Sequence, residues 1–377
     1  MIRVLEIISD TNIGGGGVSL LNYLKYYDRS QFQISVVLPK GSALVERIRE
    51  IGGVELYEID AMADKSMDRA ALKPLRELIR KIDPQLVHTH GSLVGRIAAH
   101  KEKRKVIYTK HCAFAPTGLK ATAPGRFLVG TMDKLLSDGV IAVGPSGREI
   151  LRASGIADDR IYEMLNGVEP LPQPTAQERE EARAAYGFKP EDFVLGILAR
   201  VEEYKGHQVL LDGVKKLIAS NHPIRLLVAG DGSYLNTLKE QAKELPEGTV
   251  VFAGFVRDVK KALWAMDLQV NASTESETSS LSLLEGMSIG LPALVSDIGG
   301  NPSLILDGEN GFVFPNRDSE ALAEKTVRFM ENPQLREKLS GGAKEIFNTR
   351  FTGEIFAKNI ENVYLDVLKG ATHGTER

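Results

Sequence analysis

The chain has 377 residues, of which 43% are apolar and 26% charged, and its 47 Lys and Arg side chains nearly balance 50 Asp and Glu, for a formal net charge of −3. This length predicts two or three domains, and the near-neutral charge with 6% aromatic residues argues against a nucleic-acid partner. A single cysteine, Cys112, excludes an intramolecular disulfide framework and favours a cytoplasmic location, and no apolar run reaches the roughly 20 residues that a membrane-spanning helix needs.

The first half alternates short apolar runs with amphipathic stretches. We expect strands at Val4–Ile8, Gln33–Leu38, Leu86–His88, Lys105–Thr109 and Gly139–Val143, and helices at Ala43–Ile51 and Leu72–Ile82. Alternation of this kind predicts right-handed βαβ units and a parallel sheet.

Residues 166–192 interrupt the alternation with Asn166-Gly167, the prolines at 170, 172 and 174 and then a charged helix at Ala176–Tyr186, so they are the best candidate linker. A second series follows, with strands expected at Phe193–Leu198, Ile224–Ala229, Val250–Phe252, Leu268–Asn271, Ala293–Ser296 and Phe312–Phe314. The predicted fold is α/β, with two doubly wound, Rossmann-like parallel-sheet domains, residues 1–170 and 171–350, facing a cleft. Ligands of such folds bind outside the carboxyl ends of the strands.

A glycine cluster, Gly14–Gly17, lies between the first expected strand and a helical pattern that begins at Val18. Glycines at such a place let backbone N–H groups approach an anion at a helix N-terminus. The spacing is neither the dinucleotide fingerprint nor a Walker A loop, which disfavours an NAD-dependent dehydrogenase. A flexible turn is the alternative to a phosphate site.

Two cations, Arg200 and Lys205, stand five residues apart after a strand of the second series. Arg offers a bidentate fork and Lys a point charge, so the pair suits a diphosphate. The alternative is an ordinary surface turn.

The segment 271–287 is the most informative. A Ser/Thr-rich loop follows a strand, and a helix starts near Ser280, with Ser279 and Ser280 as suitable caps. Glu277 lies just before this helix and Glu285 about one turn inside it. The free N–H groups of the helix start favour an anionic or hydroxyl-rich ligand. The alternative makes Glu277 a solvated loop acid and Glu285 an exposed helix acid.

These segments together resemble the family-four (group 1) retaining glycosyltransferases over essentially the whole chain. The motifs that carry the resemblance are Glu277-x7-Glu285-Gly-Met287, Gly290-Leu-Pro-Ala-Leu-Val-Ser296, Gly299-Gly300, Ala229-Gly-Asp-Gly232, Asn166-Gly-Val168, Val87-His-Thr-His90 and Tyr108-Thr-Lys-His111. The resemblance implies the GT-B fold, with residues 1–170 on the acceptor side, 171–350 binding the nucleotide-sugar, and a C-terminal helix in 351–377 crossing back to the first domain.

The resemblance also implies roles for individual residues. Arg200 and Lys205 match the pair that grips the donor diphosphate, and Glu285 matches the acid that binds the ribose hydroxyls. Glu277 matches the acid beside the donor sugar, and His111 matches the histidine near the reacting centre. The other matches, all to backbone or base contacts with the donor, are Gly15, Gly16, Phe255, Val256, Ser279, Ser280 and Leu281.

The implied reaction is retaining transfer from a nucleotide diphosphate-sugar, with UDP favoured, to a glycan, lipid-linked or small-molecule acceptor in cell-envelope polysaccharide or glycolipid synthesis. The nucleotide-sugar is a substrate, and no cofactor or metal is expected, since the sequence places no acid cluster beside Arg200 and Lys205. The alternatives are a nucleotide-sugar epimerase or phosphorylase of the same fold, and a non-catalytic two-domain sugar-nucleotide binding protein.

The net charge conceals an asymmetry. Residues 1–170 carry 24 basic and 20 acidic side chains, and residues 171–377 carry 23 and 30. Within the first half, residues 101–126 hold seven basic side chains against Glu102 alone. A solvated surface is one interpretation. The other is peripheral contact with an anionic membrane, at the inner face, or with an anionic acceptor, with residues 111–127 as the expected acceptor-side loop.

Overall fold

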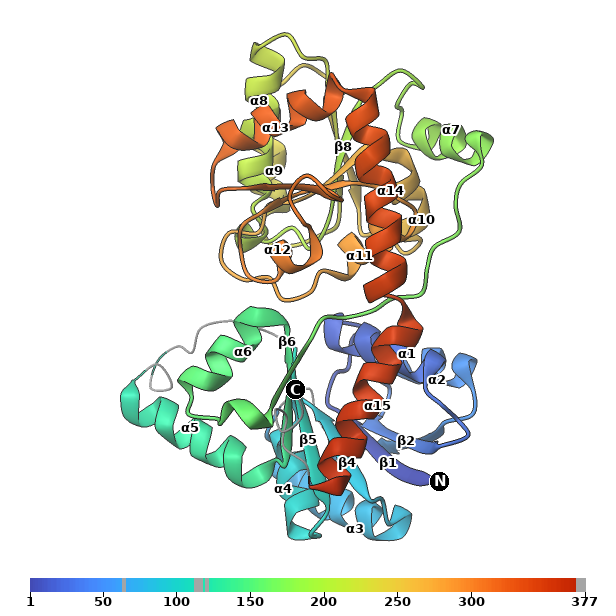
Figure 1. Cartoon of the computed structure of the whole chain (residues 1–377), viewed down its shortest axis with the longest axis vertical. Helices are drawn as coiled ribbons and strands as arrows, with labels where there is room; N and C mark the ends of the chain where they lie inside the picture. Colours follow the sequence, from blue (N-terminus) through green and yellow to red (C-terminus); the bar gives the residue numbers. More distant parts are fainter. Residues whose placement is uncertain (63–65, 112–117, 119–121, 371–377) are drawn as a thin grey trace. The chain divides into compact units, whose positions relative to one another are not determined.

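The computed structural model describes residues 1–62, 66–111, 118 and 122–370. Cys112 and most of the predicted acceptor-side loop therefore lie outside the described residues. The chain forms two compact units (Figure 1), one comprising Met1–Val168 with the C-terminal segment that begins at Gly353, and the other comprising Glu169–Thr352. Each unit is described by itself.

The first unit is built on a parallel sheet whose described strands follow the order β3-β2-β1-β4-β5-β6-β7. The strands are β1 (Ile2–Ile8), β2 (Phe32–Pro39), β3 (Glu55–Ile59), β4 (Leu86–His90), β5 (Lys105–Lys110), β6 (Gly139–Val143) and β7 (Ile161–Met164). The helices are α1 (Gly15–Tyr26), α2 (Leu44–Ile51), η1 (Arg69–Ala71), α3 (Leu72–Ile82), α4 (Leu93–Lys101), α5 (Ala123–Leu136), α6 (Gly144–Ala153), η3 (Asp158–Arg160) and the last helix, α15 (Gly353–Lys369).

Helix α15 packs beside α1 on one face of this sheet (Figure 1). Its buried residues Phe356, Ile360 and Tyr364 share a core with β1 and α1. The opposite face of the sheet is covered by α3 and α4 in a separate apolar cluster. The motif at Asn166 is tied to α1, because Ser19 Oγ donates to Asn166 Oδ1 at 3.1 Å and Asn22 Nδ2 to the Gly167 carbonyl at 3.0 Å.

The second unit repeats the arrangement, with described strands in the parallel order β10-β9-β8-β11-β12-β13. The strands are β8 (Val194–Leu198), β9 (Arg225–Ala229), β10 (Val250–Gly254), β11 (Leu268–Asn271), β12 (Ala293–Ser296) and β13 (Gly311–Phe314). The helices are α7 (Ala176–Ala185), η4 (Glu203–Lys205), α8 (His207–Ala219), α9 (Leu235–Ala242), α10 (Val259–Ala265), α11 (Leu281–Ser288), α12 (Asn301–Leu304), α13 (Ser319–Met330) and α14 (Pro333–Arg350).

Both sheets follow the Rossmann order, in which the chain reverses direction of growth between its first and fourth strands. This confirms the predicted fold class of two Rossmann-like parallel sheets. Two strands, β3 and β7, were not predicted, because neither has more than two consecutive apolar residues. Within the described residues, no helix is both long and apolar enough to span a bilayer.

Candidate active site

In the second unit, the reversal point of the sheet lies between β8 and β11, which pair in parallel. The loop after β8 contains Arg200 and Lys205, and the loop after β11 contains Glu277. The carboxyl ends of neighbouring parallel strands meet at one edge, which is where such folds bind ligands. The sequence segments that were singled out separately are therefore neighbours in space.

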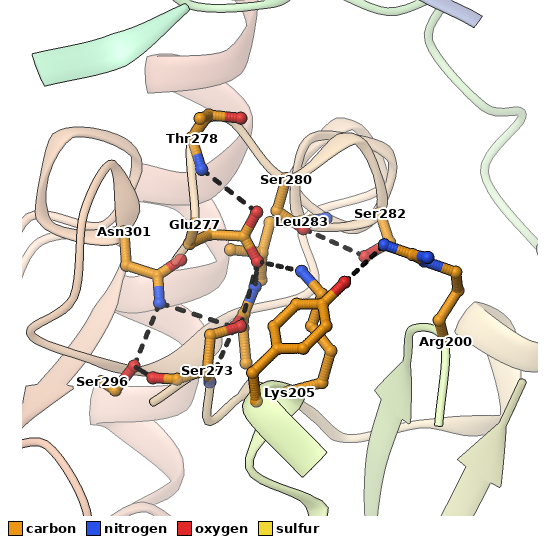
Figure 2. Close-up of polar contacts among 12 residues, drawn as sticks. Arg200, Lys205, Ser273, Glu277, Thr278, Ser280, Ser282, Leu283, Ser296 and Asn301 are labelled. Carbon is orange, nitrogen blue, oxygen red and sulfur yellow. Dashed lines mark hydrogen bonds and ion pairs between the residues drawn. The ribbon is translucent and has the colours of Figure 1, made fainter. Parts of the chain in front are cut away.

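Lys205 and Glu277 form the centre of this edge (Figure 2). Lys205 Nζ lies 2.9 Å from Glu277 Oε2, and the two side chains are only 17% and 8% exposed. The loops are also joined through their backbones, since Thr274 N donates to the Tyr204 carbonyl at 2.8 Å. A side chain at Gly206 is impossible, because its Cβ would lie 1.8 Å from the Ala272 carbonyl oxygen.

Buried polar groups hold the Glu277 carboxylate in place. Asn271 Nδ2 donates to Oε2 at 2.9 Å, and Ser273 Oγ lies 3.1 Å from the same oxygen. Burial acts to raise the pKa of Glu277, but the charge of Lys205 and these hydrogen bonds outweigh it and hold the pKa below its ordinary value. Glu277 is thus ionised and enclosed, which excludes the solvated alternative.

The Gly299-Gly300 motif lets a neighbouring loop approach Glu277 closely. A Cβ at Gly299 would lie 2.1 Å from the Glu277 carbonyl oxygen, and one at Gly300 would lie 1.6 Å from that of Thr278. Asn301, next in sequence, donates to Ser296 Oγ at 3.2 Å (Figure 2). The motif is therefore a packing requirement of the Glu277 loop.

Arg200 differs from Lys205 in its surroundings. Its side chain is exposed, and its guanidinium contacts the Tyr204 hydroxyl. The ring of Tyr204 also lies 5.4 Å from Lys205 Nζ. Tyr204 thus stands beside both cations, a contact that the sequence pattern did not predict.

Helix α11 begins where the sequence predicted. Ser280 is its N-cap residue, with the Leu283 N–H at 3.5 Å from Ser280 Oγ, and Ser279 is buried. Leu281 opens the helix, and Glu285 lies one turn further on. No described residue forms a hydrogen bond or ion pair with the Glu285 carboxylate, and burial raises its pKa to about 7.

Phe255 and Val256 follow β10 at the same edge of the sheet. Phe255 is 75% exposed, the highest value among the large apolar side chains that the structure describes as exposed. Val256 packs against the apolar cluster that contains Trp264. An exposed aromatic ring beside a partly buried, packed neighbour is a suitable surface for stacking a planar base.

In the first unit, the glycine cluster does not form a loop before the helix. Helix α1 begins at Gly15, so Gly15 and Gly16 are its first residues, and Gly14 is a cap without a side-chain hydrogen bond. A Cβ at Gly16 would lie 3.2 Å from the imidazole of His111. A side chain at Gly16 would therefore press on His111, which would have to shift by a few tenths of an ångström, whereas Gly15 has open space beside it.

His111 follows β5 and is held by another histidine. Its Nε2 lies 2.8 Å from His90 Nδ1, and the two rings are stacked with centroids 5.1 Å apart. Burial, with smaller contributions from His90 and His88, holds the pKa of His111 well below its ordinary value. His111 is thus a neutral imidazole near pH 7.

The predicted residues therefore gather into one group in each unit. Arg200, Lys205, Glu277 and the start of α11 form one, and Gly16 with His111 forms the other. Sequence reasoning missed Glu6 and left the role of His90 open, although His90 contacts His111 and Glu6 contacts His90. The signal in the sequence is small: Glu6 is the one acidic residue inside a predicted apolar strand, and His90 and His111 each stand two residues beyond the end of another predicted strand.

Comparisons with known proteins agree with this geometry. Residues 178–360 match the family model described as "Glycosyl transferases group 1", and residues 13–170 match "Glycosyltransferase Family 4". EpsD of Bacillus subtilis, to which glycosyltransferase activity is attributed, is 29% identical over 79% of this chain and 81% of its own. The alpha-monoglucosyldiacylglycerol synthase of Streptococcus pneumoniae is 28% identical over 82% of this chain and 72% of its own.

Among solved structures, HepE of Anabaena in complex with UDP superposes with a TM-score of 0.82 at 21% identity, covering 97% of this chain and 100% of that one. A glycosyltransferase of Rickettsia africae has a TM-score of 0.84 at 20% identity, with coverage of 98% and 99%. These likenesses show that the fold is shared.

Proposed function

The chain belongs to the family-four, group 1 glycosyltransferases, enzymes that use a nucleotide-sugar donor, and we propose that it transfers a sugar with retention from a UDP-sugar to a glycan or lipid-linked acceptor. The observation that carries the proposal is the Lys205–Glu277 pair at the reversal point of the second sheet. The choice of UDP is supported by the HepE structures, which contain UDP, UDP with glucose, or UDP-glucose.

The donor is proposed to lie along the strand ends of the second unit. Phe255 and Val256 flank the base, and Glu285 accepts hydrogen bonds from the ribose hydroxyls. The N–H groups of Ser279, Ser280 and Leu281, at the start of α11, bind phosphate and sugar oxygens. The neutral imidazole of His111 and the uncapped N–H groups of Gly15 and Gly16 are the first unit's contribution.

Lys205 and Arg200 are proposed to stabilise the charge of the leaving diphosphate. An ammonium group has three donors, so Lys205 can bind a phosphate oxygen while Glu277 retains its bonds from Asn271 and Ser273. Charge that develops on a leaving group is stabilised most effectively by groups already fixed in place. Glu277 then remains beside the donor sugar as an ionised, oriented acceptor.

The acceptor is proposed to be a glycan or lipid-linked molecule of the cell envelope. Two similar proteins support this class: the glycolipid synthase named above, and the capsular polysaccharide biosynthesis glycosyltransferase CapM of Staphylococcus aureus, 22% identical over 92% of this chain. Acceptors of this class are held at a membrane surface, so contact with anionic lipid is part of the proposal.

Only some of the cations in the basic segment 101–126 support contact with anionic lipid. Arg104 lies 2.6 Å from Asp83 and Lys105 lies 2.8 Å from Asp138, so two of its cations are paired within the first unit. Lys101 and Lys103 form no ion pair with a described residue. Helix α5 adds two exposed leucines, Leu128 and Leu135, at 69% and 65% exposure.

Nucleotide release tests the donor and the reaction together. The protein is incubated with UDP-glucose, UDP-galactose, UDP-N-acetylglucosamine or GDP-mannose, with and without diacylglycerol micelles, and free nucleotide and glycosylated product are measured. A thermal-shift screen with the same donors identifies binding, because a ligand at 100 times its Kd stabilises by about 2.7 kcal/mol. Binding without turnover would favour a non-catalytic protein, and preference for GDP-mannose would overturn the choice of UDP.

Co-sedimentation with phosphatidylglycerol vesicles tests the lipid contact. Reversing Lys101 and Lys103 to Glu should reduce bound protein and its salt sensitivity. Reversing Lys73 and Lys81, two exposed lysines of α3, is the matched control and should leave binding unchanged. Equal binding of both variants and the wild type would contradict a role for this segment.

A further inference from the structure

A buried polar cluster lies on the face of the first sheet that α1 and α15 cover. Glu6 pairs in register with His88 and Ile8 with His90, while His90 pairs with Thr109. Residues in register on parallel strands point to the same face, and so do residues two apart on one strand. The sheet therefore places the side chains of Glu6, His88, His90 and Thr109 together, among apolar neighbours.

The contacts run in a chain from Glu6 to His111. Glu6 Oε2 lies 2.9 Å from His90 Nε2, and His90 Nδ1 lies 2.8 Å from His111 Nε2. Glu6 is wholly buried and His90 is 7% exposed. Through one imidazole, a buried carboxylate is thus linked to the histidine that the proposed function places at the donor sugar.

Two further groups fix the other side of the carboxylate. Tyr364, on α15, donates its hydroxyl to Glu6 Oε1 at 2.6 Å, and His88 Nδ1 lies 3.1 Å from Oε2 and 2.7 Å from the Tyr364 oxygen. His88 Nε2 lies 2.6 Å from Thr109 Oγ1. The carboxylate oxygen that meets His90 is thus also contacted by His88, whereas Tyr364 binds the other oxygen.

The hydrogen-bond chemistry determines where the protons lie. An ionised carboxylate only accepts, so His90 must donate from Nε2. A neutral His90 then accepts at Nδ1, and His111 must donate from Nε2, with its own lone pair on Nδ1. Burial acts to raise the pKa of Glu6, but His88 and His90 outweigh it and lower the pKa, while burial lowers the pKa of His90. The carboxylate is therefore charged and His90 is neutral near pH 7.

We propose that Glu6, acting through His90, fixes the tautomer and ring orientation of His111, so that both are positioning residues for sugar transfer. This inference rests on the proposed function, because His111 matters only if it contacts the donor sugar. It adds two residues, far from each other in the sequence, to the machinery of the reaction. The logic is that of a buried acid that orients a histidine through its second nitrogen.

The first test reads the tautomers of the unmodified protein. Long-range ¹H–¹⁵N NMR spectra of histidine-labelled protein distinguish a protonated from an unprotonated ring nitrogen, and His90→Gln and His111→Gln variants assign the signals. We expect protonated Nε2 and unprotonated Nδ1 in both residues. A His111 ring protonated at Nδ1 in the wild type would overturn the inference.

The second test changes only the carboxylate. Glu6→Gln retains the size of the side chain but offers His90 a donor as well as an acceptor, so the proton of His90 is no longer fixed. We expect mixed tautomers at His111 and a fall in kcat of about tenfold or more, equivalent to about 1.4 kcal/mol or more of barrier. KM for the UDP-sugar should stay within about threefold.

Tyr364→Phe is the matched control, since it removes a hydrogen bond to the same carboxylate but leaves the contact with His90. Tyr364→Phe should lose about as much free energy of unfolding as Glu6→Gln does. It should retain the His111 tautomer, and its kcat should stay within about twofold of the wild type. UDP binding measured by calorimetry should be the same in both variants. If Glu6→Gln keeps wild-type kcat and tautomers, the inference is overturned while the proposed function stands.

Two other outcomes have separate meanings. Glu6, His88 and His90 also present ligand atoms within 4.8 Å of one another, and one equivalent of zinc in the purified protein would overturn the inference, because His90 Nε2 would then bind metal. A wild-type protein that transfers no sugar from any donor would overturn the proposed function, and with it the catalytic purpose of the chain.

Discussion

In the second unit, the buried carboxylate of Glu277 faces the ammonium group of Lys205, whereas in the first unit the buried carboxylate of Glu6 faces two imidazoles and a tyrosine hydroxyl. Both carboxylates belong to the central strands of their sheets or to the loop that follows them. One is stabilised by a permanent cation on a side chain that retains 17% exposure, and the other by donors enclosed on all sides.

The difference indicates what each site can do. A lysine ammonium group at the edge of a sheet can bind an arriving anion in addition to or in place of its present partner, since it has three donors on a flexible side chain. A carboxylate enclosed by imidazole and hydroxyl donors has no such freedom. The second unit is therefore suited to binding and releasing charge, and the first to holding one side chain in a fixed state.

Lys205→Ala should have the largest effect, because it removes the cation and leaves Glu277 buried without a counter-charge. We expect kcat to fall by about 30- to 1,000-fold, equivalent to about 2–4 kcal/mol, and at least as strongly as KM for the donor rises. The free energy of unfolding should fall by about 3 kcal/mol, as for other broken buried pairs. Steady-state kinetics and urea unfolding measure the two effects.

The double variant Lys205→Ala/Glu277→Gln separates these effects. Removing the orphaned charge should restore most of the stability, since an amide is cheaper to bury than an unpaired carboxylate. It should not restore kcat. An unchanged kcat in Lys205→Ala would contradict the role of Lys205 at the diphosphate, whatever its effect on stability.

Arg200→Ala removes the same charge from an exposed position. We expect kcat to fall by about 10- to 100-fold, because the guanidinium is proposed to bind the leaving diphosphate. The free energy of unfolding should stay within about 0.5 kcal/mol, as for ordinary surface substitutions. Tyr204→Phe, which removes the hydroxyl that Arg200 contacts, is the matched control and should lose less activity. A large loss of stability in Arg200→Ala would mean that exposure does not distinguish the two cations.

The affinity for UDP-glucose should depend on pH through Glu285. Burial raises its pKa from 4.5 to about 7, and ribose hydroxyls donate best to the ionised form. Binding therefore releases protons, and affinity should rise about tenfold between pH 6 and 8 before it levels off. Calorimetry in buffers of different ionisation enthalpy measures the released protons, and Glu285→Gln should remove the slope.

The same raised pKa makes the fold less stable as pH rises, whereas it makes donor binding tighter. The folded protein holds the Glu285 proton up to about pH 7, while the unfolded chain releases it near 4.5. The contribution to stability is present below pH 4.5 and is lost as pH rises to about 7. Between pH 4.5 and pH 8, the wild type should therefore lose more free energy of unfolding than Glu285→Gln does. Equal pH dependence in both proteins would mean that Glu285 is solvated.

Much of the second unit could be predicted because its chemistry is local in sequence. Arg200 and Lys205 share one loop, and Glu277, Ser280 and Glu285 share one loop and one helix, so spacing alone placed them on the same structure. The start of α11 at Ser280 followed from capping. The outer supports of this loop were missed: Ser296 Oγ donates to the Ser273 carbonyl and Asn301 Nδ2 donates to Ser296 Oγ, in packing that Gly299 and Gly300 permit.

The first unit could be predicted less well because its cluster is assembled by the sheet. Glu6 and Tyr364 are 358 positions apart in sequence, and their contact depends on the strand order and on α15 packing against α1. Glu6 lies within an apolar strand, where periodicity alone shows one polar residue and no partner. The extent of α1 was also wrong, because glycines have poor helix propensity and here form its first turn.

Chelation should have the smallest effect, since Arg200 and Lys205 supply the charge that a divalent ion would otherwise bring to the diphosphate. We expect kcat within about twofold after treatment with EDTA. Among the described residues, the Glu6, His88 and His90 set is the one with metal-binding geometry, and its nitrogen and oxygen atoms already bond one another. Complete loss of activity that Mg²⁺ restores would contradict this prediction. It would mean that a divalent ion neutralises the diphosphate in the second unit. Loss that only Zn²⁺ restores would place it in the first, and would replace a hydrogen-bonded chain to His111 with a metal site.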